Sequence, residues 1–260
     1  MNEGFLYGTH EVVIQCIFLA LMLAATEIGF RLGIRIEAST PADTKSQIST
    51  VEAAVLGVLA LLLGFTMSMA VSRFEVRKQL VLDEANAINT SYLRSQLLPA
   101  PEGAAIASLL RQYVSVRVQY GTAAGNDLAR LESLKEQTSL LQKEFWALAV
   151  AYAQRDPNEV KAGSMVQSLN EAIDLAAARW MALKNHVPAS VIYVNAVVSL
   201  LSVFLVGYTF GVNGRRNILS MCVLALSITL VLAVIIDLDR PRSGFIRASQ
   251  QPMIDLLNQL

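Results

Sequence analysis

Four long apolar segments divide the chain and predict four helices that cross a membrane. They run from about residue 12 to 30, 51 to 71, 190 to 210 and 218 to 236. Each is close to the ~20 residues that a helix needs to cross the hydrocarbon layer. Helices are expected because only helices and closed barrels satisfy their backbone hydrogen bonds in lipid. The pattern therefore predicts an all-α integral membrane protein with four transmembrane helices.

The second apolar segment continues directly into a charged, amphipathic one. Residues 50–97 contain no Pro, and no Gly follows Gly64 in that stretch. We therefore expect one continuous helix of roughly 70 Å at ~1.5 Å per residue, more than twice the ~30 Å hydrocarbon layer. Pro99 and Pro101 are expected to end it, because Pro disfavours a helical conformation in the preceding residue.

A soluble insert of about 115 residues lies between the second and third segments. Helices are predicted over residues 102–120 and 127–154 and from residue 159 onwards, with a turn at 156–158. The last two helices carry apolar residues at the 3-4-3-4 spacing of a packed helix face. The first stripe is Leu131, Leu134, Leu141, Phe145, Leu148 and Tyr152, with Thr138 in one slot, and the second is Val166, Leu169, Ile173, Ala176, Trp180, Leu183 and Val187. We expect an antiparallel helical bundle, without strands.

These elements predict a four-part organisation along the chain. Residues 1–72 hold the first two transmembrane helices, and residues 73–188 form the soluble bundle. Residues 189–238 hold the last two transmembrane helices, and residues 239–260 are a C-terminal tail.

Composition excludes several classes of function. The chain is 54% hydrophobic and only 16% charged, with a net charge of zero, so no nucleic-acid partner is expected. Cys16 and Cys222 lie within apolar runs, and no Cys or His spacing fits a metal site, so neither a disulfide nor a metal or other cofactor is expected. The chain lacks GxSxG, P-loop, HExxH and dinucleotide-binding motifs, which argues against an enzyme.

The distribution of Lys and Arg predicts the orientation of the chain in the membrane. Eight basic residues flank the spans on the side of the insert, and five lie in the two short loops on the other side. The positive-inside rule then places the insert and both termini in the cytoplasm. Arg31 and Arg35, which follow the first span, favour the reverse orientation. Residues 1–11 carry no basic residue other than His10, so the first span is expected to be retained and not cleaved as a signal peptide.

Two features of the spans have both a structural and a functional interpretation. Glu27 lies near the end of the first span, where it either pairs with Arg31 one turn later or takes part in transport. Gly57 and Gly64 in the second span allow close helix packing, or else Gly64 lines a narrow passage together with Phe65, Ser68 and Ser72.

Two polar groups follow the second span on the same predicted helix. The basic residues Arg73, Arg77 and Lys78 either anchor the helix to lipid phosphates or attract anions. The polar residues further along form either a buried layer that fixes the register of the bundle or a hydrated lining. They are Asp83, Glu84, Asn86 and Asn89. After the fourth span, Asp237 and Asp239 alternate with Arg240 and Arg242, which is typical of a self-neutralising turn.

The second span and the tail together resemble a known family. Residues 63–74 read LGFTMSMAVSRF, which is similar to the second membrane helix of bestrophin anion channels, with its Gly-Phe pair, small or β-branched run, Arg and aromatic residue. A longer pattern resembles bacterial bestrophin-like membrane proteins of unknown function over nearly the whole chain. It consists of GFTMSMAVSRFEVRKQLVLDEANAINTSYLR and, after the last span, DLDRPRSGFIRASQQP.

The resemblance implies a homopentamer in a bacterial inner membrane, in which the second helix of each subunit lines a central pore. Phe65 matches one apolar neck position and Leu61 another, whereas Gly57 stands where the family has a third bulky residue. Bestrophins that respond to calcium carry a run of acidic residues after the fourth span. In the corresponding segment of this chain, Asp237 and Asp239 are the only acidic residues.

Two functions remain open at this point. The first is a homo-oligomeric, anion-conducting channel, with a permeant inorganic anion, membrane lipids and further copies of the chain as partners. The alternative is a non-conducting membrane scaffold or sensor whose helical insert binds a partner. A proton-coupled transporter that uses Glu27 is weaker, because no inverted repeat or broken span is evident.

Overall fold

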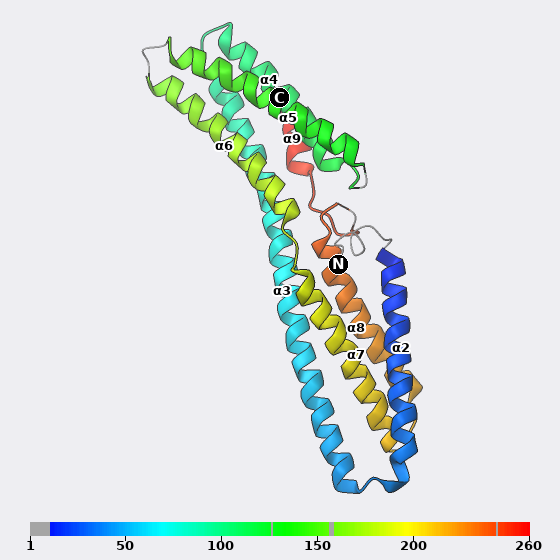
Figure 1. The fold of residues 1–260 in the computed structure, drawn as a ribbon. Coiled ribbons are helices and arrows are strands. Elements are labelled where there is room, and N and C mark those ends of the chain that lie inside the picture. The colour runs from blue at the N-terminus through cyan, green and yellow to red at the C-terminus, as the bar shows by residue number, and fades with distance from the viewer. Residues whose placement is uncertain (1–10, 126, 156–158, 243) are drawn as a thin grey trace. The chain divides into compact units, whose positions relative to one another are not determined.

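The computed structural model describes residues 11–125, 127–155, 159–242 and 244–260, and in this part of the chain all regular structure is helical (Figure 1). The first ten residues, which entered the expectation of a retained first span, and the turn expected at 156–158 lie outside it. The elements in chain order are α2 (Glu11–Ile36), the short 3₁₀ helix η1 (Glu37–Ser39), α3 (Ala42–Ser95), α4 (Glu102–Thr122), α5 (Leu128–Ala153), α6 (Glu159–Lys184), α7 (Ala189–Val212), α8 (Ile218–Asp239) and α9 (Gln251–Gln259).

Four helical segments are long and apolar enough to cross a membrane, in agreement with the four spans predicted from the sequence. These segments lie in α2, in α3, in α7 and in α8. α3 is a single helix of 54 residues, and its apolar part comes first. It ends at Ser95, a few residues before Pro99 and Pro101.

The chain divides into two compact units. The first unit comprises Met1–Ser72 and His186–Arg240, and the second comprises Arg73–Asn185 and Pro241–Leu260. The boundary falls within α3, directly after its apolar part. The C-terminal residues after α8 belong to the same unit as the soluble helices.

In the first unit, α2 and α7 run parallel and their backbones touch. Gly29 and Gly33 on α2 face Gly207 and Gly211 on α7, and a Cβ on any of the four would overlap a backbone carbonyl oxygen of the other helix. Small residues four apart allow such close packing between helices in lipid. The contact depends on four glycines that lie far apart in the sequence.

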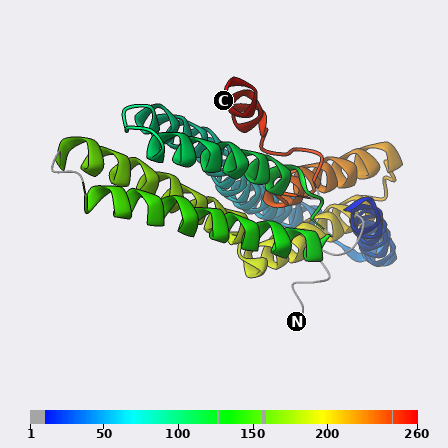
Figure 2. The same cartoon turned by 90° about the horizontal axis from the view of Figure 1, so that it is seen from above.

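In the second unit, α4, α5 and α6 lie side by side, with the second part of α3 and with α9 (Figure 2). The core is built from large apolar side chains that exclude water almost completely. Tyr113 of α4 meets Phe145 of α5 edge to face, with ring centroids 5.6 Å apart. Around them are buried Ile88, Ile106, Leu110, Met165, Leu169 and, from α9, Met253.

The two apolar stripes predicted for the insert face this interior. On α5, every residue of the stripe, including Thr138, is buried or half-buried. On α6, every residue of the stripe as far as Leu183 is also buried or half-buried. Val187 was expected to continue it on the same helix, but α6 ends at Lys184. Pro188 directly follows Val187 and disfavours a helical conformation at Val187. This explains why α6 ends before that residue.

Candidate functional site

The side of α3 that holds the predicted neck residues faces away from the rest of its unit. Leu61 is 58% exposed and Phe65 is 65% exposed, and Ser68 is exposed on the same side. A Cβ added to Gly57 or Gly64 would meet nothing within 4 Å. The glycines of α3 are therefore not explained by close packing within the described chain. We call this surface the open face of α3. It consists of five residues at helical spacing: Gly57, Leu61, Gly64, Phe65 and Ser68.

The opposite side of α3 packs into the unit. Leu59, Leu63, Thr66 and Ala70 are buried there. Asn195 of α7 donates a hydrogen bond from Nδ2 to Oγ1 of Thr66 at 2.9 Å. The contact fixes which side of α3 packs against α7, and so it leaves the open face uncovered.

The three basic residues expected after the second span have different surroundings. Nε of Arg73 donates to Oδ1 of Asn185 at 3.4 Å, and Lys78 is exposed, with its Nζ 3.6 Å from a carboxylate oxygen of Glu75. Arg77 is buried, with 4% of its surface exposed. The sequence thus groups three residues of which Lys78 is exposed, Arg73 is half-buried and Arg77 is buried.

The four residues of the predicted polar layer also separate. Asp83 is half-buried and accepts a hydrogen bond from Nε2 of Gln79 at 2.8 Å, Asn86 is exposed, and Asn89 is half-buried. Glu84 is completely buried. Of these four residues, only Glu84 is fully buried in the second unit.

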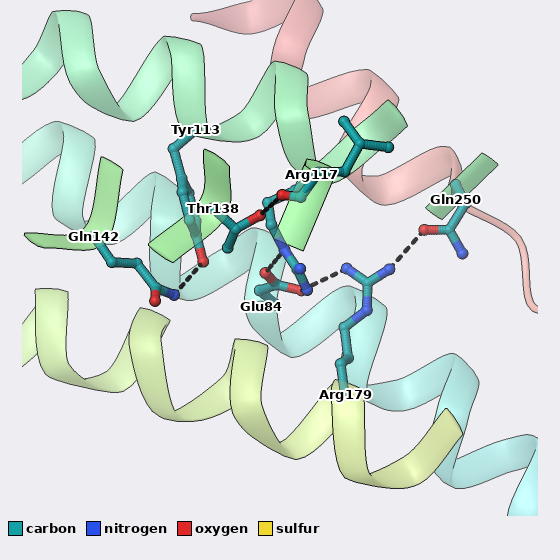
Figure 3. A network of polar contacts seen from close by, with 8 residues as sticks. Glu84, Tyr113, Arg117, Thr138, Gln142, Arg179 and Gln250 are labelled. Carbon is teal, nitrogen blue, oxygen red and sulfur yellow. Dashed lines mark hydrogen bonds and ion pairs between the residues drawn. The ribbon is translucent and has the colours of Figure 1, made fainter. Parts of the chain in front are cut away.

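Glu84 is held by two arginines from two other helices (Figure 3). Arg117 of α4 donates to its two carboxylate oxygens, from Nε at 2.6 Å and from Nη2 at 3.0 Å. Arg179 of α6 donates to the same carboxylate through Nη1, and through Nη2 to Oε1 of Gln250 at 2.8 Å. Gln250 directly precedes α9. This network, which we call the Glu84 hub, therefore joins α3, α4, α6 and the C-terminal segment.

The charges of the hub are mutually stabilised. Burial alone would raise the pKa of Glu84, but the positive charges of Arg117 and Arg179 outweigh it and hold that pKa below its ordinary value. Burial also opposes the charge on Arg117, yet the Glu84 carboxylate raises the pKa of that guanidinium. Burial next to this carboxylate raises the pKa of Tyr113, whose hydroxyl accepts a hydrogen bond from Gln142 at 3.0 Å. Burial lowers the pKa of the Arg179 guanidinium, although the Glu84 carboxylate opposes this effect. Arginine nevertheless stays protonated in proteins. The hub therefore holds two positive charges and one negative charge.

The polar layer predicted from the sequence did not include Arg117, Arg179 or Gln250. A signal was present for the two arginines, because each interrupts a largely apolar run, VSVRVQY in α4 and AAARWMAL in α6. A charged residue at a core position of a helix stripe needs a buried partner. The sequence contains no corresponding signal for Gln250.

Glu27 in the first unit has the partner that was expected and a second one. Its Oε1 accepts a hydrogen bond from Nε of Arg31 at 2.7 Å, which confirms the predicted pairing of these two residues. Nη2 of Arg216, between α7 and α8, donates to Oε2 at 2.6 Å. Glu27 thus links α2 to a loop that is distant in sequence.

The acidic run after the fourth span forms the end of a helix and not a separate turn. Asp237 and Asp239 are buried in the last turn of α8. Oδ1 of Asp239 accepts the backbone N–H of Val187 at 2.8 Å, and His186 Nδ1 lies 3.3 Å from Oδ2. Across the described residues, no group of three or more His, Cys, Asp or Glu side chains is placed to hold a metal ion.

The chain belongs to the bestrophin-like family, because the family model of the bestrophin-like domain matches residues 19–253. The fold is also that of a bacterial bestrophin homologue from Klebsiella pneumoniae. A crystal structure of it solved by Zn-SAD phasing has 16% sequence identity and a TM-score of 0.65, with 96% of this chain and 99% of that chain covered. A structure of a variant with a Trp-to-Ala mutation has 15% identity and a TM-score of 0.67, with the same coverage. No curated protein sequence matches the chain.

Proposed function

We propose that this integral membrane protein is a homo-oligomeric, anion-conducting channel whose pore is lined by α3. Five copies are the number that the resemblance to bestrophins suggests. The open face of α3 is the single observation that carries the proposal. It supports a pore because it combines uncovered bulky side chains with glycines that touch nothing in their own chain.

The residues of the open face suit a narrow, partly dry conduit. Around a symmetry axis, copies of Leu61 and Phe65 would form apolar rings, and an apolar constriction gates conduction by wetting and dewetting. Gly57 and Gly64 would leave wider positions between these rings, and the Ser68 hydroxyl would give an ion a polar contact.

Basic residues near the end of the span would favour anions over cations. Arg73 and Lys78 follow the apolar part of α3, and their charges would raise the local concentration of an inorganic anion. Arg77 fits this role less well than the sequence predicted, because its side chain is buried. We further propose that the second unit and both termini are cytoplasmic, as the distribution of Lys and Arg suggests.

Two measurements on the purified full chain test the proposal. The first is chloride flux from liposomes that contain the protein, and the second is the rotational symmetry of single particles in detergent. We expect flux above that of empty liposomes and a ring of copies with α3 nearest the axis. Folded protein that conducts no anion and forms a dimer without a central opening would refute the channel and favour a membrane scaffold.

A further inference from the structure

The second unit contains a cavity lined by four arginines. Its volume is about 310 Å³, and residues from α3, α6, the end of α4 and the C-terminal segment surround it. Arg77 and Arg179 are buried there, Arg242 is half-buried, and Arg247 is exposed. The lining includes no Asp or Glu among the residues that the structure describes.

The charge around this cavity is positive overall. Glu84 is the carboxylate bound to Arg179, and it also holds Arg117, so the hub keeps one net positive charge. In the described part of the chain, neither Arg242 nor Arg247 forms an ion pair with a carboxylate. Residues 249–251, at the start of α9, also line the cavity, and the N-terminus of a helix adds partial positive charge.

Three of the four arginines, Arg179, Arg242 and Arg247, are held in place before any ligand arrives. Nη1 of Arg242 donates to the carbonyl oxygen of Tyr120 at 2.9 Å, and its guanidinium lies over the Tyr120 ring, 4.5 Å from the centroid. Arg179 is fixed between Glu84 and Gln250, and Nε of Arg247 donates to the carbonyl oxygen of Gly244 at 2.9 Å. Prearranged donors lose little entropy when a ligand binds.

We propose that this cavity binds a small anion that carries phosphate. Arginine is favoured for phosphate, because its planar guanidinium presents several donors that match two phosphate oxygens at once. The volume lies at the lower end of the range for small-molecule sites, roughly 300 to 1,000 Å³, which suits a phosphate or diphosphate group with a small substituent. The phosphate belongs either to a soluble compound or to a lipid headgroup.

Binding to the purified full chain in detergent tests this proposal without any measurement of flux, so its outcome is separate from that of the proposed channel. The probes for isothermal titration calorimetry are inorganic pyrophosphate for the soluble source and short-chain phosphatidic acid for the lipid source. Short-chain phosphatidylcholine is the control lipid. One variant carries both Arg242→Gln and Arg247→Gln, and a second variant carries Arg247→Gln alone. Arg130→Gln is the matched control, since Arg130 is exposed and does not line the cavity.

We expect one of the two phosphate probes to bind, and the double substitution to weaken it about tenfold or more, as the loss of charge-assisted hydrogen bonds implies. Arg130→Gln should bind as the unmodified chain does. If the double variant does not remain folded in a thermal-unfolding measurement, the single variant Arg247→Gln decides the outcome. Loss of this arginine disturbs the fold little, because among the described residues Arg247 donates only to the nearby carbonyl oxygen of Gly244. The proposal is overturned if neither probe binds the unmodified chain, or if the folded arginine variants bind equally well.

Discussion

The carboxylate of Glu84 and the guanidinium of Arg117 form a two-point ion pair inside the second unit, with donor–acceptor distances of 2.6 and 3.0 Å. Neither side chain is more than 5% exposed. A pair buried to this extent stabilises a fold only as long as both partners remain, because either charge alone is costly away from water.

Glu84→Gln should therefore destabilise the protein strongly. The substitution leaves Arg117 and Arg179 facing each other without a negative charge, and breaking a buried pair costs about 3–5 kcal/mol. Thermal unfolding in detergent measures the effect. Glu132→Gln is the control, because Glu132 forms an exposed pair with Lys135 and should change the unfolding temperature little. Equal effects of the two substitutions would contradict the structural role of the Glu84 hub.

The same carboxylate should make stability depend on acidic pH. The folded protein holds the pKa of Glu84 below the ordinary value of 4.5, so the unfolded chain takes up this proton first as the pH falls. The contribution of Glu84 is complete above about pH 4.5 and is lost as the pH falls through the folded pKa. Unfolding temperatures recorded between neutral and acidic pH should fall less steeply for Glu84→Gln than for the unmodified chain. Parallel curves for the two proteins would be evidence against the shift.

Gly207→Val should disrupt the contact between α2 and α7. Its side chain would overlap the backbone of α2, and overpacking of this kind typically costs about 1–3 kcal/mol. Gly163→Ala in α6 is a suitable control, since its Cβ meets nothing within 4 Å. Ala favours a helix over Gly by up to about 1 kcal/mol, so the control should be neutral or stabilising. Size-exclusion chromatography after heating compares the stability of the two variants. A Gly207→Val protein as stable as the unmodified chain would show that α2 and α7 lie further apart than the structure places them.

The hydrogen bond between Thr66 and Asn195 should show a small coupling energy. A double-mutant cycle with Thr66→Val and Asn195→Ala isolates it, and such bonds inside membrane proteins average about 0.6 kcal/mol, with a maximum of roughly 1.7. The cycle is measured by unfolding in mixed detergent micelles. Thr66→Val combined with Ser227→Ala, on the exposed side of α8, should be additive. Additivity in both cycles would mean that the bond between α3 and α7 contributes nothing.

Leu61→Ala and Phe65→Ala should increase the basal anion flux if α3 lines a pore, because smaller apolar side chains widen and wet the constriction. Leu201→Ala in α7 is the matched control, since Leu201 is 57% exposed and Leu61 is 58% exposed. Flux from liposomes that contain equal amounts of each protein compares them. A similar increase for Leu201→Ala, or no increase for either α3 variant, would argue against the open face as the pore wall.

Much of the fold could be predicted because its determinants are local. Length and hydrophobicity of four segments identify the spans, and the 3-4-3-4 stripes identify the interior faces of α5 and α6. The pairing of Glu27 with Arg31 was also predictable, since residues four apart meet on a helix. Arg216 as the second partner of Glu27 was not, because it lies 189 residues further along the chain.

The candidate site was predictable only in part. The spacing of Leu61, Phe65 and Ser68 shows that they share one side of α3, but the sequence does not show whether another helix covers that side. Arg77 and Glu84 were grouped with less buried neighbours, because their burial depends on segments that lie far away in the sequence. The cavity with Arg242 and Arg247 was not predicted at all, since it requires the C-terminal segment to join the unit of α4 and α6.

The amino-acid sequence by itself determined the helices, the spans and the apolar stripes, because hydrophobic periodicity and the absence of Pro act over a few turns. Tertiary structure alone decided which glycines approach another backbone, which charges are buried together and which side of α3 stays uncovered. The physical reason is that burial, close approach and ion pairing depend on distances between segments, and a linear pattern does not contain those distances.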